Sequence, residues 1–186
     1  MIGIDEAGRG SLAGSMYLVG VKILDNKIIQ NCFLLKDSKK LTKNQRNKIF
    51  KYLKENKNML DVKILKFSAD KIDLKGLSDI YKEGLEKIYR YFKNKYPNET
   101  ILFDGNTIYG LKLDIKTTTK AEDKYKEVAI ASIIAKVIRD QEIEEIAKKY
   151  PEYLWEKHNG YPQNIHKQKI KELGYIEGIH RKSWKI

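Results

Sequence analysis

The chain has 186 residues, which suits one domain of ordinary size, and its 41% of hydrophobic residues excludes a wholly disordered protein. The formal net charge of +12 indicates a polyanionic partner. Nucleic acid is the first candidate and an anionic membrane surface the second. The alternative is that the charge only keeps the protein in solution. The single cysteine, Cys32, excludes an intrachain disulfide, and no apolar run approaches the ~20 residues of a membrane span, so we expect a cytoplasmic protein that makes no use of a membrane.

The first ten residues combine a strand-forming run with two acids and a glycine-rich turn. Residues 1–4 are mostly apolar and favour a strand, and the sequence Gly-Ile-Asp-Glu-Ala-Gly-Arg-Gly occupies 3–10. Because neighbouring residues on a strand point to opposite faces, Asp5 and Glu6 can share one metal cluster only if the chain bends there. A solvent-exposed acidic turn after an edge strand is the alternative.

Strands and helices alternate along the rest of the chain. Runs of β-branched and aromatic residues predict strands over 15–24, 61–68, 100–106 and 111–117, and helical spacing predicts helices over 43–55, 77–96, 128–149 and 165–173. We expect Thr42 to cap the first helix. In the helix over 128–149, the first half is apolar and is expected to pack on the sheet, while the charged half from Arg139 onward is expected to face solvent. This order of elements predicts a mixed sheet flanked by helices.

Asp104 ends one of these apolar runs and precedes a glycine. We therefore expect it at the carboxyl end of a buried strand, where ligands bind in open α/β sheets. Carboxylates placed in this way suit Mg²⁺ or Mn²⁺ ions, which prefer oxygen ligands and assist phosphodiester hydrolysis. The candidate ligands are Asp5, Glu6, Asp104 and an acid near the start of the helix over 128–149.

Several motifs resemble those of the type 2 ribonucleases H, and of ribonuclease HII in particular. The matching stretches lie within residues 3–184 and read GIDEAGRG at 3–10, DSKKL at 37–41, AIASIIAKVIRD at 129–140, HNGYP at 158–162 and HRKSW at 180–184. The chain departs from the family pattern at Ser11 and Ser15, where the family often has proline. The resemblance implies an α/β fold in one domain over 1–186, with a ribonuclease H-like mixed sheet of about five strands, flanking helices, and a less regular helical C-terminal part from about residue 150.

The resemblance also implies a set of metal ligands. Asp5, Glu6 and Asp104 match three acids that hold two Mg²⁺ or Mn²⁺ ions during catalysis. Counting back from the helix motif, the fourth acid of the family falls on Glu122, which is one methylene longer than the Asp of the family. A small change of register would instead bring in Asp123. Both could also be simple N-terminal acids that the helix dipole favours.

By the same resemblance, the residues that recognise the ribose 2′-hydroxyl or line the nucleic-acid path are Gly8, Arg9, Gly10, Ser38, Lys39 and Tyr161. We expect a monomeric endoribonuclease of DNA replication and repair. It would cleave the RNA strand of RNA–DNA hybrids and the 5′ side of single ribonucleotides in duplex DNA, leaving 3′-hydroxyl and 5′-phosphate ends. A DNA nuclease or resolvase on the same fold, and a hybrid-binding module impaired by Glu122, are the alternatives.

Overall fold

The computed structural model describes residues 1–32 and 41–184, so the expected substrate-binding residues Ser38 and Lys39 lie outside the described part of the chain. Five strands form one sheet in the order β3-β2-β1-β4-β5. Their bounds are β1 Ile2–Ala7, β2 Met16–Ile23, β3 Leu60–Phe67, β4 Ile101–Asp104 and β5 Ile115–Thr118. The predicted strand over 111–117 begins later, at Ile115, after a turn in which Tyr109 and Gly110 have positive φ values.

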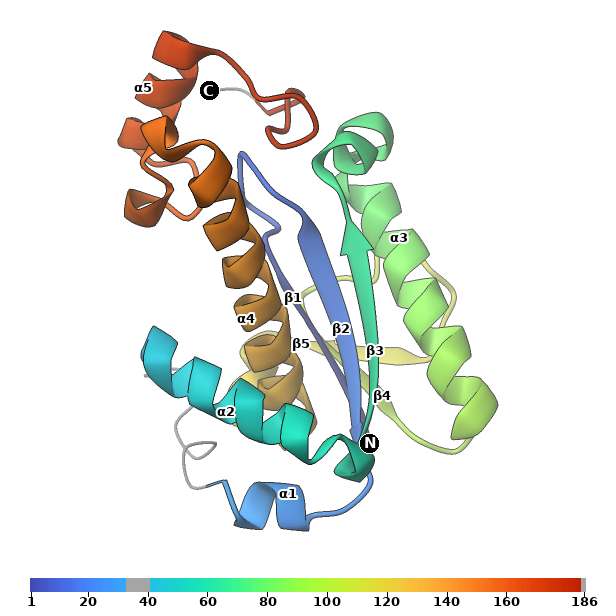
Figure 1. The fold of residues 1–186 in the computed structure, drawn as a ribbon. Coiled ribbons are helices and arrows are strands. Elements are labelled where there is room, and N and C mark those ends of the chain that lie inside the picture. The colour runs from blue at the N-terminus through green and yellow to red at the C-terminus, as the bar shows by residue number, and fades with distance from the viewer. Residues whose placement is uncertain (33–40, 185–186) are drawn as a thin grey trace.

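The sheet is mixed, as predicted, and β1 is its central strand (Figure 1). On one side β1 pairs antiparallel with β2, and β2 pairs antiparallel with β3. On the other side β1 pairs parallel with β4, and β4 pairs parallel with β5. The glycine-rich turn joins the antiparallel pair directly, whereas a parallel partner requires a crossover that returns the chain to the same end of the sheet.

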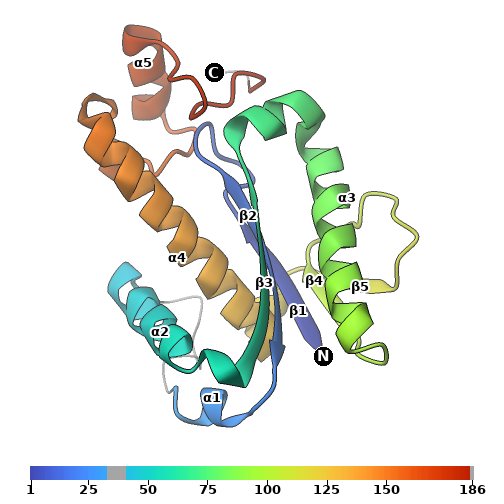
Figure 2. The same ribbon diagram turned by 45° about the vertical axis from the view of Figure 1, so that its right-hand side comes forward.

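Helices cover both faces of the sheet, as two views of the ribbon show (Figures 1 and 2). On one face lie α4 (Lys126–Lys149), α2 (Lys43–Glu55) and the short α1 (Lys27–Gln30). On the other face lies α3 (Ala69–Lys95), which packs on the apolar side chains of β1 and β2. None of the helices in the described part of the chain is long and apolar enough to cross a membrane.

Two local predictions about helix starts have different outcomes. The Thr42 side chain accepts a hydrogen bond from the Gln45 N–H, and the Gln45 side chain accepts one from the Thr42 N–H, which confirms the predicted cap. The helix predicted over 77–96 begins earlier, because Ser68 caps a first segment that ends at a kink. Gly76 forms that kink with a φ of 76°.

The second half of α4 is exposed on one face only. The prediction that its charged residues face solvent holds for residues such as Lys148 and Lys149, and it is wrong for the inner face. Arg139 and Asp140 are buried, and so is Ile143. This half of α4 packs against the C-terminal part, which consists of the 3₁₀ turns η4 (Pro151–Tyr153) and η5 (Trp155–Lys157) and the helix α5 (Asn164–Leu173). The covering segment follows α4 in sequence, so the charge pattern of the helix alone does not reveal it.

The three histidines of the chain are buried together in the C-terminal part. The Ile176 N–H donates to His180 Nδ1 (2.7 Å), so His180 carries its proton on Nε2 and donates it to His166 Nε2 (3.2 Å). His166 in turn donates from Nδ1 to the carbonyl of Tyr161 (3.0 Å). Burial lowers the pKa of His166 and of His180 to about 4. The chain of hydrogen bonds therefore needs both rings neutral.

We expect this cluster to make the stability of the protein depend on pH in a predictable direction. The pKa of both rings is lower in the folded protein than the ordinary value of 6.5, so their stabilising effect is complete above about pH 6.5 and is lost as the pH falls toward about 4. Melting temperatures of the parent and of His180→Asn across this range provide the measurement. Parallel curves for the two proteins would contradict the prediction, because the carboxylates titrate equally in both.

Candidate active site

A polar hollow of roughly 360 Å³ lies at the carboxyl end of β4, beside β1. It is lined by four acids, one arginine and three small or polar residues, namely Asp5, Glu6, Arg9, Asp104, Gly105, Asn106, Thr119 and Glu122. The acids come from β1, from the end of β4, and from η3 (Ala121–Asp123), the 3₁₀ turn between β5 and α4. Segments far apart in sequence thus meet at one edge of the sheet.

Asp5 and Asp104 occupy corresponding positions on neighbouring parallel strands. Ile4 pairs with Phe103, so the next residue of each strand is an acid, and both acids lie toward α4. The two acids therefore sit on adjacent strands and on the same face of the sheet. The Ser132 hydroxyl of α4 interacts with Asp5, and the Glu6 N–H donates to Asp5 Oδ1 (2.7 Å).

Glu6 reaches the same hollow from the opposite face of β1. Its side chain lies on the α3 side, near Tyr81, because side chains alternate along the strand. The bend that we expected to be necessary for a shared cluster is absent from this described strand, since the pairing of β1 with β2 is continuous through Ala7. Both acids line the hollow because β4 ends at Asp104 and leaves that edge of β1 open.

Asp104 and Glu122 are joined through the backbone of the turn that leads into α4. The Lys120 N–H donates to Asp104 Oδ1 (3.0 Å), and the Glu122 N–H lies 3.5 Å from Asp104 Oδ2. Lys120 has a φ of 61°, which turns the chain sharply and directs Glu122 toward the hollow. Asp123 is exposed, and Glu122 is the residue of this acidic pair that lines the hollow.

The surroundings of the hollow disfavour the ionised form of three of its acids. Burial raises the pKa of Asp5 well above its ordinary value, and repulsion from Glu6 adds to the effect. Burial also raises the pKa of Glu6, against a smaller lowering by Tyr81 and Arg9. The pKa of Asp104 is raised to about 7 by burial and by its interaction with Glu122. A bound cation would relieve this accumulation of negative charge.

The donor set fits a hard divalent cation. Four carboxylates and nearby carbonyl and amide oxygens are the ligands that Mg²⁺ and Mn²⁺ prefer. Among residues 1–32 and 41–184, no three acidic, histidine or cysteine side chains are placed closely enough to hold one ion by themselves. The acids instead surround a shared open space, which leaves room for water and substrate oxygens.

The glycine turn and Tyr161 both pack on Arg139 of α4, and Arg9 of the turn also lines the hollow. Gly8 has a φ of +90°, and a Cβ there would lie 2.5 Å from Arg139 Nε and 2.6 Å from the Ser15 carbonyl, so only glycine fits. The Arg139 guanidinium carbon lies 4.8 Å from the centre of the Tyr161 ring. Tyr161 is half-buried, and it packs on the arginine rather than among the acids.

Sequence reasoning missed three residues of α4 and the C-terminal segment that hold this region. Ser132 interacts with Asp5, Arg139 lies under the glycine turn, and buried Arg181 donates from Nη1 to the Arg9 carbonyl (3.0 Å). One signal for two of these residues was available in the sequence. Ser132 and Arg139 lie seven residues apart in the 129–140 motif, which places them two helical turns apart on one face of the helix.

A mixed five-strand sheet with acids converging at the end of its central strands places the protein in the class of ribonuclease H-like nucleases. The sequence profile of the family described as Ribonuclease HII matches residues 2–186. The chain belongs to the ribonuclease HII family. Members of this family are ribonucleases H, which cleave RNA in RNA–DNA hybrids.

Individual relatives agree with this assignment. A ribonuclease HII of Campylobacter jejuni subsp. jejuni is 41% identical over 186 residues, covering 100% of this chain and 91% of that protein. The ribonuclease HII in the PCNA:RNase HII complex from Archaeoglobus fulgidus has a TM-score of 0.77 at 29% identity, covering 100% of this chain and 95% of that one. Bst-RNase HIII, solved in complex with Mn²⁺, shares the fold with a TM-score of 0.71 at 18% identity, covering 98% of this chain and 66% of that one.

Proposed function

We propose that this ribonuclease H also cuts on the 5′ side of a single ribonucleotide embedded in duplex DNA, and that it uses two divalent metal ions for both kinds of substrate. The observation that carries the proposal is the hollow into which β1, β4 and η3 bring Asp5, Glu6, Asp104 and Glu122. Burial raises the pKa of Asp5, Glu6 and Asp104, and interaction with a neighbouring acid adds to the effect for Asp5 and Asp104, which favours the binding of positive charge.

Each acid has a distinct role in this proposal. Asp5 and Asp104, side by side on parallel strands, hold Mg²⁺ or Mn²⁺, while Glu6 and Glu122 complete the ligands from the two sides of the hollow. When bound, such ions lower the pKa of the attacking water and stabilise the charge that develops on the phosphate. Ser132 and the backbone N–H groups of Glu6 and Lys120 keep the two aspartates oriented.

The ribose is recognised next to the acids in this proposal. The backbone of Gly8, Arg9 and Gly10 engages the 2′-hydroxyl, which both donates and accepts hydrogen bonds, and Tyr161 packs against the sugar or base. The 2′-hydroxyl is the group that distinguishes RNA from DNA. Such recognition explains how one ribonucleotide within a DNA strand could direct the cut.

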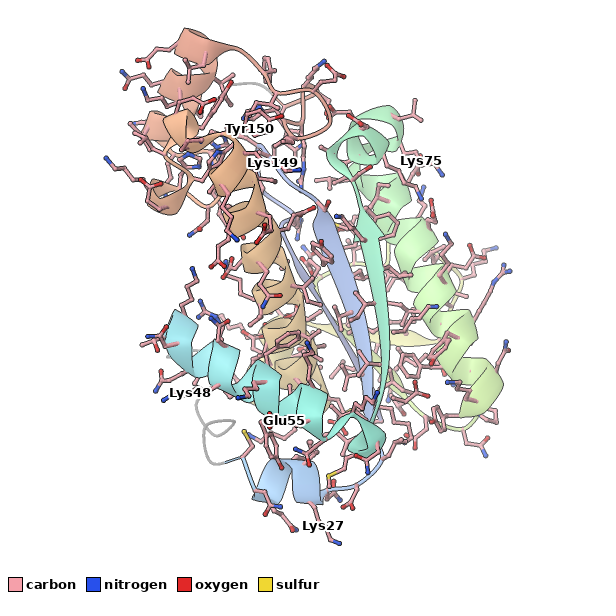
Figure 3. All side chains as sticks on the ribbon, in the orientation of Figure 1. Lys27, Lys48, Glu55, Lys75, Lys149 and Tyr150 are labelled. Carbon is pink, nitrogen blue, oxygen red and sulfur yellow. The ribbon has the colours of Figure 1, made fainter. Side chains whose placement is uncertain are left out.

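The positive charge of the chain suits the duplex. Most of its 37 basic residues are lysine, which contacts phosphate as a point charge without reading sequence. Figure 3 shows that exposed lysines from separate elements, Lys27, Lys48, Lys75 and Lys149, lie at the periphery of the fold. We propose that Ser38 and Lys39 also line the nucleic-acid path, and that one chain is sufficient for activity in the cytoplasm.

Metal binding should stabilise the protein, and more strongly at high pH. The pKa of Asp104 is raised to about 7, so protons compete with cations below that value, and the carboxylate is available above it. The melting temperature should therefore rise more on addition of Mn²⁺ at about pH 8 than at about pH 5.5. An Asp104→Asn variant should show a smaller increase at both values. Equal increases for the parent at both pH values would count against this site.

Cut mapping tests the proposed function. The protein is incubated with Mg²⁺ or Mn²⁺ and a duplex that contains one ribonucleotide, and the ends of the products are analysed. We expect one cut on the 5′ side of the ribonucleotide, with 3′-hydroxyl and 5′-phosphate ends, and no cut in the matching all-DNA duplex. Cleavage of the all-DNA duplex, or of continuous hybrid alone, would refute the proposal.

A further inference from the structure

Arg139 is fully buried and ties together three segments that are distant in sequence. From α4, its Nη2 donates to Ser11 Oγ (2.7 Å), to the Ala13 carbonyl (3.3 Å) and to the Asn159 carbonyl (3.0 Å). The first two partners belong to the loop that follows the glycine turn, and the third immediately precedes Gly160 and Tyr161. One guanidinium group thus holds both segments that the proposed function assigns to ribose recognition.

The rest of the guanidinium is enclosed by the same two segments. Gly8 packs against Nε, at a place where any side chain would collide, and the ring of Tyr161 covers the group at 4.8 Å from the guanidinium carbon. Nε and Nη1 have no hydrogen-bond partner among the described residues. The group is therefore sandwiched between the glycine turn and the tyrosine.

Stability alone does not account for a cation in this position. Within residues 1–32 and 41–184, Arg139 forms no ion pair, and burial lowers its pKa against the weaker opposing effect of Tyr161, Asp140 and Glu142. A hydrophobic side chain commonly fills such a space at a lower cost in free energy than a buried charge. The guanidinium supplies two things that a hydrophobic group would not, namely the hydrogen bonds from Nη2 to both segments and a flat cationic face against the Tyr161 ring.

The position of Arg139 on α4 connects ribose recognition with the acids. Ser132, which interacts with Asp5, lies two helical turns before Arg139 on the same face of the helix, about 10 Å along its axis. Strand β1 runs along this face, so that Ser132 lies beside Asp5 and Arg139 lies beside Gly8. The rigid helix therefore fixes the distance between the hollow and the glycine turn.

We infer that Arg139 is a positioning residue that sets the selection of a single ribonucleotide, because it holds the glycine turn and Tyr161 together at a fixed distance from the carboxylate hollow. This inference rests on the proposed function. A loosened turn would place the ribose incorrectly relative to the acids, and a displacement of about 1 Å can cost about a hundredfold in rate. A continuous hybrid offers a ribose at every position, so it tolerates the same loosening better.

The test compares two substrates and several variants. Arg139→Lys keeps the charge but loses the planar group that packs between Gly8 and the Tyr161 ring. Ser11→Ala removes only the hydroxyl partner of Nη2, and it guards against a failure of the first variant to fold. Tyr153→Phe is the matched structural control, because it removes a partly buried hydrogen bond to the Gly174 carbonyl in the same C-terminal part and leaves the hydrogen bonds of Arg139 in place. Rates are measured below every melting temperature. Binding is measured with EDTA present, for the duplex with one ribonucleotide and for its all-DNA counterpart.

We expect Arg139→Lys to reduce kcat/KM on the single-ribonucleotide duplex by about tenfold to a hundredfold, and on the continuous hybrid by less than about fivefold. Its preference for the ribonucleotide duplex over all-DNA duplex in EDTA should fall as well. Ser11→Ala should act in the same direction with a smaller effect, and Tyr153→Phe should leave the ratio of the two rates unchanged. Combining Arg139→Lys with Tyr161→Ala should give less than the product of the single effects, since both act on one contact.

Other outcomes distinguish a failure of the proposed function from a failure of the inference about Arg139. If the parent does not cut at the single ribonucleotide, the proposed function fails. If the parent cuts there, and Arg139→Lys slows both substrates in equal proportion with an unchanged binding preference, the inference about Arg139 is overturned while the proposed function stands. Multiplicative effects of Arg139→Lys and Tyr161→Ala would also overturn it.

Discussion

Replacing Glu122 by Gln is expected to reduce metal-dependent cleavage by about a thousandfold, because the change removes one negative charge from the proposed ligands of two divalent ions. Loss of several kcal/mol of charge stabilisation corresponds to a rate effect of this size. Glutamine keeps the shape of the side chain, so the turn before α4 should remain intact. The measurement is single-turnover cleavage of a continuous RNA–DNA hybrid in saturating Mg²⁺ or Mn²⁺.

The neighbouring acid provides the matched control. Asp123 is exposed and adjacent to Glu122, so Asp123→Asn removes the same charge from the same turn and should change the rate by less than about threefold. Glu122→Asp, which keeps the charge on a shorter side chain, should retain most of the activity. A fast Glu122→Gln variant combined with a slow Asp123→Asn variant would show that Asp123 is the ligand.

Replacing Tyr161 by Ala is expected to slow cleavage at a single ribonucleotide by the equivalent of about 1–3 kcal/mol, the usual contribution of one stacking contact with a nucleotide. The carboxylate hollow does not include this ring, so metal binding should be unaffected. The continuous hybrid should be affected less, because it can bind in many registers. Rates for both substrates at one fixed salt concentration test this, since phosphate contacts depend on salt.

Tyr161→Phe separates the contribution of the aromatic ring to the cleavage rate from that of the phenolic hydroxyl. Phenylalanine keeps the ring over the Arg139 guanidinium but removes the phenolic hydroxyl. If the hydroxyl contacts the ribose, Tyr161→Phe should be slow on the single-ribonucleotide duplex, and if stacking dominates, it should resemble the parent. Equal rates for Tyr161→Ala and the parent on that duplex would remove Tyr161 from the site.

The fold was largely predictable because its signals are local. The apolar runs, the Thr42 cap and the spacing of helical residues identified the elements, and the order of elements indicated a mixed sheet. The errors have tertiary causes. Charge on the second half of α4 suggested solvent exposure, but Arg139 is buried against the C-terminal part, and Asp140 is buried near Arg46 of α2. The first segment of α3 was missed because Gly76 interrupts the helical geometry.

The candidate acids were also predictable, but their arrangement was not. The motif at 3–10 and the end of the run at Asp104 indicated three of them, and the helix motif indicated Glu122 by its spacing. The sequence suggested that Asp5 and Glu6 need a bend to meet, whereas the end of β4 exposes the edge of β1 to both. The length of a neighbouring strand is a property of the sheet, and β1 alone carries no signal for it.

Supporting contacts are the hardest part to predict. Ser11 and Ser15 depart from the pattern of the family, yet both bond to α4, since Ser11 accepts from Arg139 and the Ser15 hydroxyl donates to Glu142 (2.7 Å). Arg181 reaches the glycine turn from the far end of the chain. Each contact joins residues more than a hundred positions apart, so spacing and periodicity contain no trace of them.

Counting the metal ions bound per chain tests the central claim most directly. Mn²⁺ is titrated into the protein in complex with a nicked product duplex, which cannot be cut again, and free Mn²⁺ is followed by its electron paramagnetic resonance signal. We expect two bound Mn²⁺ ions per chain for the parent and fewer for Asp104→Asn, with the duplex still bound in both cases. Identical Mn²⁺ binding by the parent and Asp104→Asn would contradict the assignment of the carboxylate hollow as the metal site.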